Sequence, residues 1–161
     1  MNVKATEYQI HVAFAAWLRK HLFPGVLWWH TPNEGKRSRA ESYRQHLLGL
    51  RPGVSDFCFI FDCGRSTNPY LLELKNHDNP LTEAQREFLR HARNAGASVA
   101  MVRSIEEAAK QILAWGLVSR GALAELPDPL AVSYKRKAPS IGRAKRNYAK
   151  PQGNKEQAHE C

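Results

Sequence analysis

Two nearly continuous apolar segments, residues 57–61 and 70–72, constrain the fold of this chain more than any other feature. Apolar runs of this length and composition indicate strands that are buried on both faces. The turn-forming residues 64–69 between them predict a β-hairpin. If the hairpin is centred between Gly64 and Arg65, Asp56 lies opposite Glu73. The chain must therefore cover a sheet on both faces and accommodate two acids at one end of it.

The flanking sequence supplies elements that could cover this sheet. A Thr or Ser followed three residues later by Gln or Glu predicts helices at 7–22, 83–95 and 105–115. Aromatic and branched residues predict strands at 26–30 and 97–102, and residues 34–48 suggest a loop with a helical portion. The order α-β-(α)-β-β-α-β-α predicts an α/β fold with a mixed central sheet flanked by helices.

The composition is that of one globular domain. With 161 residues, 43% of them hydrophobic, the chain can bury a single core. It has no apolar run long enough to cross a bilayer and no signal peptide, so we expect no membrane partner. The expected location is cytoplasmic, in the host cytoplasm or nucleoid if a phage encodes the protein. Its three cysteines lack a Cys-x-x-Cys pair, which argues against a disulfide framework or a zinc knuckle.

The formal net charge of +9 favours polyanionic partners, because binding them releases counterions. Residues 119–161 carry nine Lys and Arg against four Asp and Glu, which is more than half of the excess. No acidic residue occurs from 130 to 155, where basic residues alternate with proline, glycine and serine. We therefore expect a folded domain at 1–118 and a flexible basic tail at 119–161 that contacts phosphates. The alternative is a solvated tail that only aids solubility.

Asp56, Glu73 and Lys75 are expected to converge at one end of the hairpin. Side chains alternate along a strand, so Glu73 and Lys75 point one way and Leu74 the other. Two close carboxylates repel each other, and Mg²⁺ or Mn²⁺ between them would remove that repulsion while leaving positions for water and a substrate phosphate. Such an ion polarises the phosphoryl oxygen and activates a bound water. Lys75 could orient or deprotonate that water, or balance charge in the transition state.

A surface hairpin with Glu and Lys alternating on its exposed face is the ordinary explanation of such a short pattern. Three features argue against it here. The adjacent apolar runs indicate burial, and charged residues at the end of buried strands are costly unless something binds them. The Pro52-Gly53 turn directly before Asp56 also constrains the approach of the chain to that residue.

The chain resembles the PD-(D/E)XK nuclease superfamily, through Pro-Gly-Val-Ser-Asp at 52–56, Glu-Leu-Lys at 73–75 and a helical Gln85. More narrowly, His-Thr-Pro-Asn-Glu-Gly-Lys-Arg-Ser at 30–38 and Gly-Leu-Arg-Pro-Gly at 49–53 resemble the VRR-NUC (virus-type replication-repair nuclease) domain. The resemblance covers residues 6–116 and leaves the basic tail outside the domain pattern.

This resemblance implies a restriction-endonuclease-like core and a metal-dependent nuclease with no small-molecule cofactor. The implied metal ligands are Asp56, Glu73, the carbonyl of Leu74 and Glu7, and the implied catalytic residues are Asp56, Glu73, Lys75 and Gln85. Small stand-alone members resemble Holliday-junction resolvases and act as homodimers. DNA and a second copy of the chain are therefore the implied partners.

Some of these residues also have structural explanations. An acid at Glu7 is favoured by the helix dipole, and Gln85 could merely close a capping box with Thr82. Both are nevertheless spaced to face inward with the apolar residues of their helices. The histidines, including His30 and His77, lack a metal-ligand spacing, and we expect them to be ordinary.

Candidate nucleic-acid-binding residues lie before Asp56 and in the tail. The basic side chains among them would position phosphates, and solvated loop cations are the alternative. Asn33 and Glu34 are expected to line the site, as the resemblance implies. The set is Asn33, Glu34, Lys36, Arg37, Arg39, Arg51, Lys135, Arg136 and Lys137.

The patterns predict a nuclease dependent on Mg²⁺ or Mn²⁺, and the resemblance implies an endodeoxyribonuclease that acts on branched, Holliday-junction-like DNA as a homodimer. One rival is a nucleic-acid-binding module that keeps the nuclease fold without cleaving. Another is a nuclease of broad or RNA specificity. All three share the basic charge, so charge does not separate them.

Overall fold

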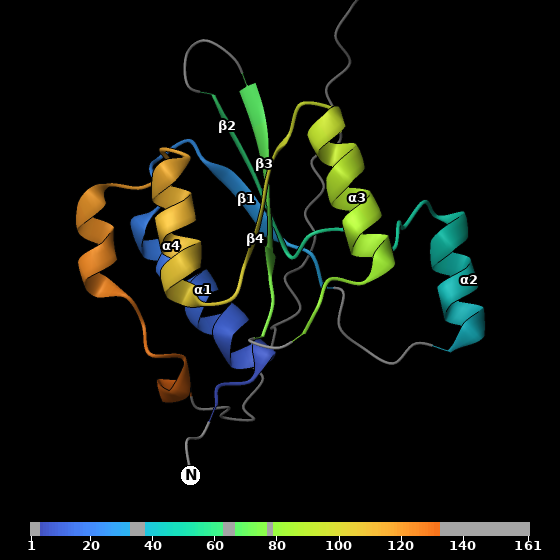
Figure 1. Cartoon of the computed structure of the whole chain (residues 1–161), viewed down its shortest axis with the longest axis horizontal. Helices are drawn as coiled ribbons and strands as arrows, with labels where there is room; N and C mark the ends of the chain where they lie inside the picture. The colour runs from blue at the N-terminus through green and yellow to red at the C-terminus, as the bar shows by residue number, and fades with distance from the viewer. Residues whose placement is uncertain (1–3, 33–37, 63–66, 77–78, 133–161) are drawn as a thin grey trace, which may run out of the picture.

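The helices and strands follow the order expected from the sequence. The computed structural model describes residues 4–32, 38–62, 67–76 and 79–132. Its elements are α1 (Glu7–His21), β1 (Leu27–His30), α2 (Arg39–Leu47), β2 (Phe57–Asp62), β3 (Thr67–Leu74), α3 (Glu83–Asn94), β4 (Ser98–Val102), α4 (Ile105–Ala114), η1 (Arg120–Glu125) and η2 (Pro129–Ala131). The predicted α/β order is confirmed, and two 3₁₀ turns, η1 and η2, follow it (Figure 1).

The four strands form one mixed sheet in the order β1-β2-β3-β4. β2 is antiparallel to both β1 and β3, whereas β3 and β4 are parallel, with α3 as the crossover between them. In the hairpin, Phe57 pairs with Leu72, which is the register expected from the sequence. Asp56 and Glu73 are the next residues outward. The hairpin therefore brings both acids to the same end of the sheet.

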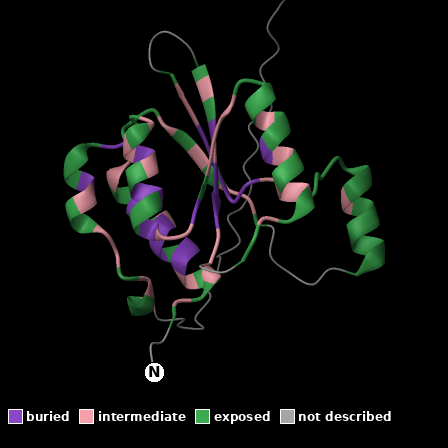
Figure 2. Cartoon of the chain, viewed as in Figure 1, coloured by how far each residue is buried: buried purple, intermediate pink, exposed green. Residues whose placement is uncertain are grey.

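Helices cover both faces of the sheet, with α1 and α4 on one face and α3 on the other (Figure 1). α1 turns Ile10, Phe14, Trp17 and Leu18 inward at helical spacing, and all four are buried. They share one core with apolar residues of the sheet and α4, visible as the purple centre of Figure 2. Among the described residues, no helix combines the length and the apolar character needed to cross a membrane.

The packed chain continues beyond the boundary expected at residue 118. Leu117, Val118 and Ala122 are buried, and the indole Nε1 of Trp17 donates a hydrogen bond of 3.1 Å to the carbonyl of Ala122. Residues up to Val132 pack against α1 and α4. Composition does not reveal this segment, because a few apolar anchors are enough to hold a stretch that otherwise resembles a linker. Residues 133–161 lie outside the described part of the chain, so the basic tail expected there stays a prediction.

The turn before Asp56 docks against the start of α3. Gly53 adopts a φ of +80°, which is the left-handed region that favours glycine. A Cβ on Gly53 would overlap the backbone carbonyl of Ala84 and lie 2.6 Å from the amide nitrogen of Gln85. Only a residue without a side chain allows this approach. The turn therefore sets the distance between the Asp56 end of β2 and the first turn of α3.

Substituting Gly53→Ala should destabilise the domain more than Gly49→Ala does. Gly49 has a similar φ of +84° but has open space around its missing Cβ, so its substitution isolates the conformational cost of about 1–2 kcal/mol. Gly53→Ala adds a backbone overlap, for which overpacking typically costs a further 1–3 kcal/mol or so. Chemical denaturation of the two variants measures the difference. Equal losses in the free energy of unfolding would contradict the close packing of this turn on α3.

Candidate active site

The carboxyl end of β3 carries a fully buried carboxylate. Glu73 has no exposed surface, while Leu74 beside it points into the apolar core. The Lys75 ammonium lies 3.0 Å from Oε1 of Glu73, and the side-chain amide of Gln85 donates a hydrogen bond to the same oxygen. Strand alternation thus places Glu73 and Lys75 on one side, as the sequence predicted. Gln85 reaches the same carboxylate from the first turn of α3.

Asp56 is held at the adjoining end of β2. Its Oδ2 accepts a hydrogen bond of 2.9 Å from the backbone amide of Leu74, which ties the side chain to β3. Its backbone carbonyl accepts a hydrogen bond of 2.8 Å from the amide of Thr31, just past β1. Asp56 is buried, with 6% of its surface exposed. The segment at the end of β3 thus holds the carboxylate of Asp56, and the segment after β1 holds its backbone.

Glu7 completes the acidic set from α1. It is the first residue of that helix, and its carboxylate lies 3.7 Å from the Lys75 ammonium, which is also paired with Glu73. Glu7 is only partly exposed. The helix dipole favours an acid at this position, and the packing of α1 against the sheet directs that acid toward Lys75. The two explanations offered for Glu7 by the sequence are thus compatible.

The carboxylates share a strongly perturbed electrostatic environment. Burial, with the nearby charge of Asp56, raises the pKa of Glu73 from 4.5 to about 7, even though Lys75 opposes the shift. Burial likewise raises the pKa of Asp56, although the Leu74 amide and the neighbouring cationic groups partly offset it. Two buried acids with raised pKa values at one strand end are the arrangement that a bound cation would stabilise.

Lys75 remains in its charged form in this environment. Burial lowers the pKa of its ammonium, but the hydrogen bond and charge of Glu73, together with Glu7 and Asp56, outweigh burial and raise it overall. Three carboxylates therefore surround one cation. An ammonium among carboxylates is suited to balancing negative charge at this site.

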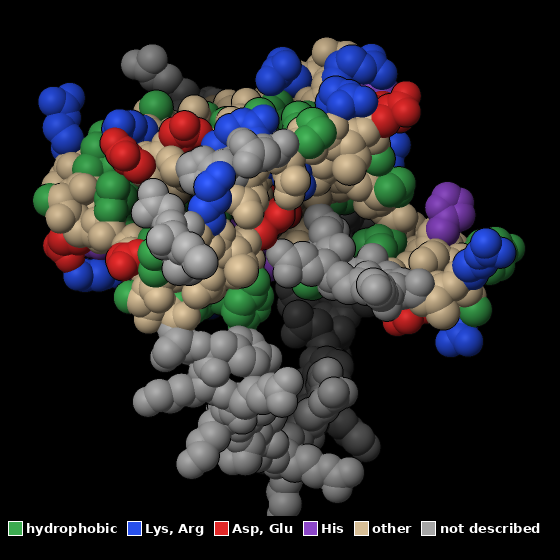
Figure 3. All heavy atoms as spheres, turned by 60° about the horizontal axis from the view of Figure 1, so that its bottom comes forward, with side chains coloured by type: hydrophobic (Ala, Val, Ile, Leu, Met, Phe, Trp, Pro, Cys, Tyr) green, Lys and Arg blue, Asp and Glu red, His purple; other side chains and the backbone are tan. Residues whose placement is uncertain are grey.

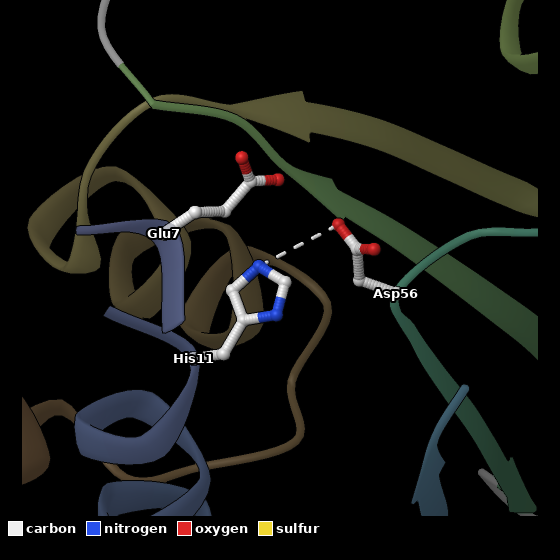
Figure 4. A group of neighbouring side chains, drawn as sticks. All are labelled: Glu7, His11 and Asp56. Atoms are coloured by element: carbon white, nitrogen blue, oxygen red, sulfur yellow. Dashed lines mark ion pairs between the residues drawn. The ribbon is translucent and has the colours of Figure 1, made fainter. Parts of the chain in front are cut away.

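The donor set fits a divalent metal ion. Glu73 Oε2 is buried and has no hydrogen-bond partner among the described residues, so it carries an unused acceptor position. Asp56, Glu73 and the carbonyl oxygen of Leu74 offer the oxygen ligands that Mg²⁺ and Mn²⁺ use. A second arrangement around Asp56 adds nitrogen: Glu7, His11 and Asp56 offer ligand atoms that lie within 4.8 Å of one another (Figure 4).

His11 belongs to the site although its sequence pattern does not predict it. It is buried at 5% exposure on α1, and its Nε2 lies 3.8 Å from Asp56 Oδ2 and 3.3 Å from the carbonyl oxygen of Leu74. The expectation that the histidines are ordinary does not hold for His11. A signal was present, because His11 follows Glu7 by four residues and shares its inward helical face. His77 lies outside the described residues.

The expected nucleic-acid contacts divide into two groups. Arg39, at the start of α2, and Arg51 are both exposed. Arg51 also lines a groove of about 440 Å³, together with Gln45 of α2 and Gln85 of α3. Gln85 connects this groove to the buried acids. The remaining predicted residues lie outside the described part of the chain, namely Asn33, Glu34, Lys36, Arg37, Lys135, Arg136 and Lys137.

The face that carries the site is bordered by basic side chains. Figure 3 shows Lys and Arg side chains over α3 and α2, an acidic side chain near the centre, and further acidic side chains toward the edges. α3 contributes the exposed Arg86, Arg90 and Arg93. α2 has no buried residue and stands away from the core (Figure 2). The buried acids suit a cation, and the exposed arginines of α3 suit a polyanion, so this face could bind both.

Comparison with known proteins agrees with this architecture. A mixed α/β sheet with buried acids at the ends of its two central strands is consistent with a nuclease-type domain. The chain belongs to the VRR-NUC domain family, whose model matches residues 5–106. A solved structure described as a "VRR_NUC domain protein" shares the fold at 18% identity and a TM-score of 0.53, over 74% of this chain and 94% of that chain. No curated protein matches the chain.

The metal-free protein should lose stability as pH rises from about 4.5 to about 7. Glu73 binds its proton more tightly in the folded state, where its pKa is about 7, than in the unfolded chain at 4.5, so deprotonation favours unfolding in this window. A shift of this size corresponds to roughly 3 kcal/mol at most. Glu73→Gln should flatten the dependence, leaving the smaller contribution of Asp56. Denaturation with a metal chelator, from pH 4.5 to 8, measures the two profiles; parallel profiles would contradict the raised pKa.

Proposed function

We propose that this chain is a metal-dependent endonuclease that hydrolyses DNA phosphodiester bonds. The observation that carries the proposal is the buried Glu73 carboxylate, bound by Lys75 and Gln85 beside Asp56. Such a cluster is expensive to bury, and its unused carboxylate oxygen is available to a cation. Membership in the VRR-NUC family supports the same chemistry.

Asp56, Glu73 and the Leu74 carbonyl would hold the ion, with Glu7 at its border. When bound, a divalent ion such as Mg²⁺ or Mn²⁺ polarises a phosphoryl oxygen and lowers the pKa of a water. Lys75 would stabilise negative charge on the phosphate in the transition state, since its pKa is raised and it stays an ammonium. Gln85 would keep Glu73 in place through their hydrogen bond.

The substrate is proposed to be DNA, bound along the basic border of the site. Arg51 lines the groove that leads to Gln85, and Arg39 is exposed at the start of α2, so both could contact phosphates of the substrate. We further propose that two copies act together on branched DNA, since a junction presents more than one backbone to cut. Charge alone does not separate DNA from RNA, so both are needed as test substrates.

Lys75→Ala should lower cleavage by at least about 100-fold, the usual effect of removing one transition-state-stabilising group. Cleavage of branched, flapped, linear and RNA substrates is measured with Mg²⁺, with Mn²⁺ and with chelator. Binding should survive, because Lys75 is one cation among many. Lys110→Ala is the matched control, since Lys110 is exposed on α4 and pairs only with the neighbouring Glu106 in the described structure.

Two results would contradict this assignment. Wild-type activity in the Lys75→Ala variant would remove Lys75 from the mechanism. Binding without cleavage by the wild type, on every substrate and with either metal, would instead favour the rival in which the domain binds nucleic acid but does not cut it.

Removing residues 133–161 should weaken DNA binding and its dependence on salt. These residues carry eight Lys and Arg against two Glu, and the truncation leaves the packed segment that ends at Val132 intact. For each phosphate that the tail no longer neutralises, the negative slope of log affinity against log salt concentration should become shallower by about 0.9. Fluorescence anisotropy over a range of salt concentrations measures the slope. An unchanged slope would show that the tail acts only on solubility.

A further inference from the structure

His11 is a buried imidazole that faces the acidic site without a part in the mechanism above. It lies on α1 one turn after Glu7, and Figure 4 shows both side chains directed toward Asp56. Only 5% of its surface is exposed. A buried polar ring requires partners, and the partners of His11 are atoms of the proposed metal site.

The ring nitrogen Nε2 of His11 lies among oxygens that could share a cation with it. Nε2 is 3.3 Å from the carbonyl oxygen of Leu74 and 3.8 Å from Asp56 Oδ2. Metal–nitrogen and metal–oxygen bonds of about 2.0–2.2 Å place neighbouring ligands roughly 3–4 Å apart. Glu7 is a neighbour of this pair, since the ligand atoms of Glu7, His11 and Asp56 all lie within 4.8 Å of one another.

The opposite side of the ring has the partner that a metal-binding histidine needs. A ligating histidine nearly always donates its other N–H to an acceptor, which fixes its tautomer and orientation. Nδ1 of His11 lies 3.2 Å from Nε2 of His30. His30 is itself positioned at the end of β1, paired with Phe57, against whose ring it packs edge-on at 4.9 Å.

We propose that His11 is a nitrogen ligand that makes this site prefer first-row transition metals, Mn²⁺ among them, over Mg²⁺, with His30 as the residue that positions it. The inference rests on the proposed function, because it assumes that the acidic cluster holds a cation. Mg²⁺ takes oxygen ligands almost exclusively, whereas imidazole suits first-row transition metals. A nitrogen ligand beside Asp56 therefore biases the choice of ion.

Mn²⁺ itself is the probe. Electron spin-echo spectroscopy of bound Mn²⁺ should show nitrogen modulation from an imidazole in the wild type and in the control His91→Ala, whose histidine is exposed on α3. His11→Gln, which keeps a hydrogen-bonding side chain, should abolish it. Calorimetry should show Mn²⁺ affinity falling by about tenfold or more in His11→Gln, with Mg²⁺ affinity nearly unchanged. His30→Ala should keep the modulation but weaken Mn²⁺ binding by about tenfold, as loss of an outer-shell partner does.

The possible failures are distinguishable. Mn²⁺ bound without nitrogen modulation, or equal losses of Mn²⁺ and Mg²⁺ affinity in His11→Gln, would overturn the role of His11 while leaving metal-dependent cleavage intact. Failure of the wild type to bind either ion would overturn this inference and the proposed function together. Circular dichroism of each variant establishes that it is folded before its metal binding is compared.

Discussion

The burial of the Glu73 carboxylate at the end of β3 is the interaction on which the rest of the site depends. An ionised carboxylate removed from water is costly unless charge and hydrogen bonds replace its hydration. Lys75 and Gln85 supply that replacement at one oxygen. Lys75 comes from the same strand, whereas Gln85 comes from α3 and Asp56 from β2. The cluster therefore exists only when the hairpin and α3 are docked together, which makes the site a consequence of the packed core.

The first turn of α3 shows how a structural role and a site role combine in one side chain. Oε1 of Gln85 accepts a hydrogen bond of 2.9 Å from the amide of Thr82, closing the capping box. That bond orients the amide so that Nε2 is left to donate to Glu73. The sequence pattern presents these roles as alternatives. They are linked instead, because the cap decides which end of the amide faces the carboxylate.

Local patterns make much of this arrangement predictable, and long-range packing accounts for the rest. The hairpin register follows from a short turn between two apolar runs, so the amino-acid sequence alone is enough to place Asp56 opposite Glu73. Glu7 is expected from helical spacing and the family resemblance. His11 carries the same helical signal, four residues after Glu7, but its contact with Asp56 depends on how α1 crosses the sheet, which spacing within α1 does not specify. The packing of Ala122 on Trp17 is unpredictable for the same reason.

Proton and metal binding are coupled at this site through Glu73. Its raised pKa means that, near neutral pH, a fraction of the metal-free protein holds a proton on a carboxylate that a cation needs ionised. A cation therefore competes with that proton, and its apparent affinity should rise with pH through about 7. Lys75 differs from Glu73 in that it keeps its proton: its pKa is raised, so it stays charged throughout this range. The fold thus separates two tasks at one strand end: Glu73 exchanges its proton for a cation, while Lys75 keeps a fixed positive charge for the phosphate.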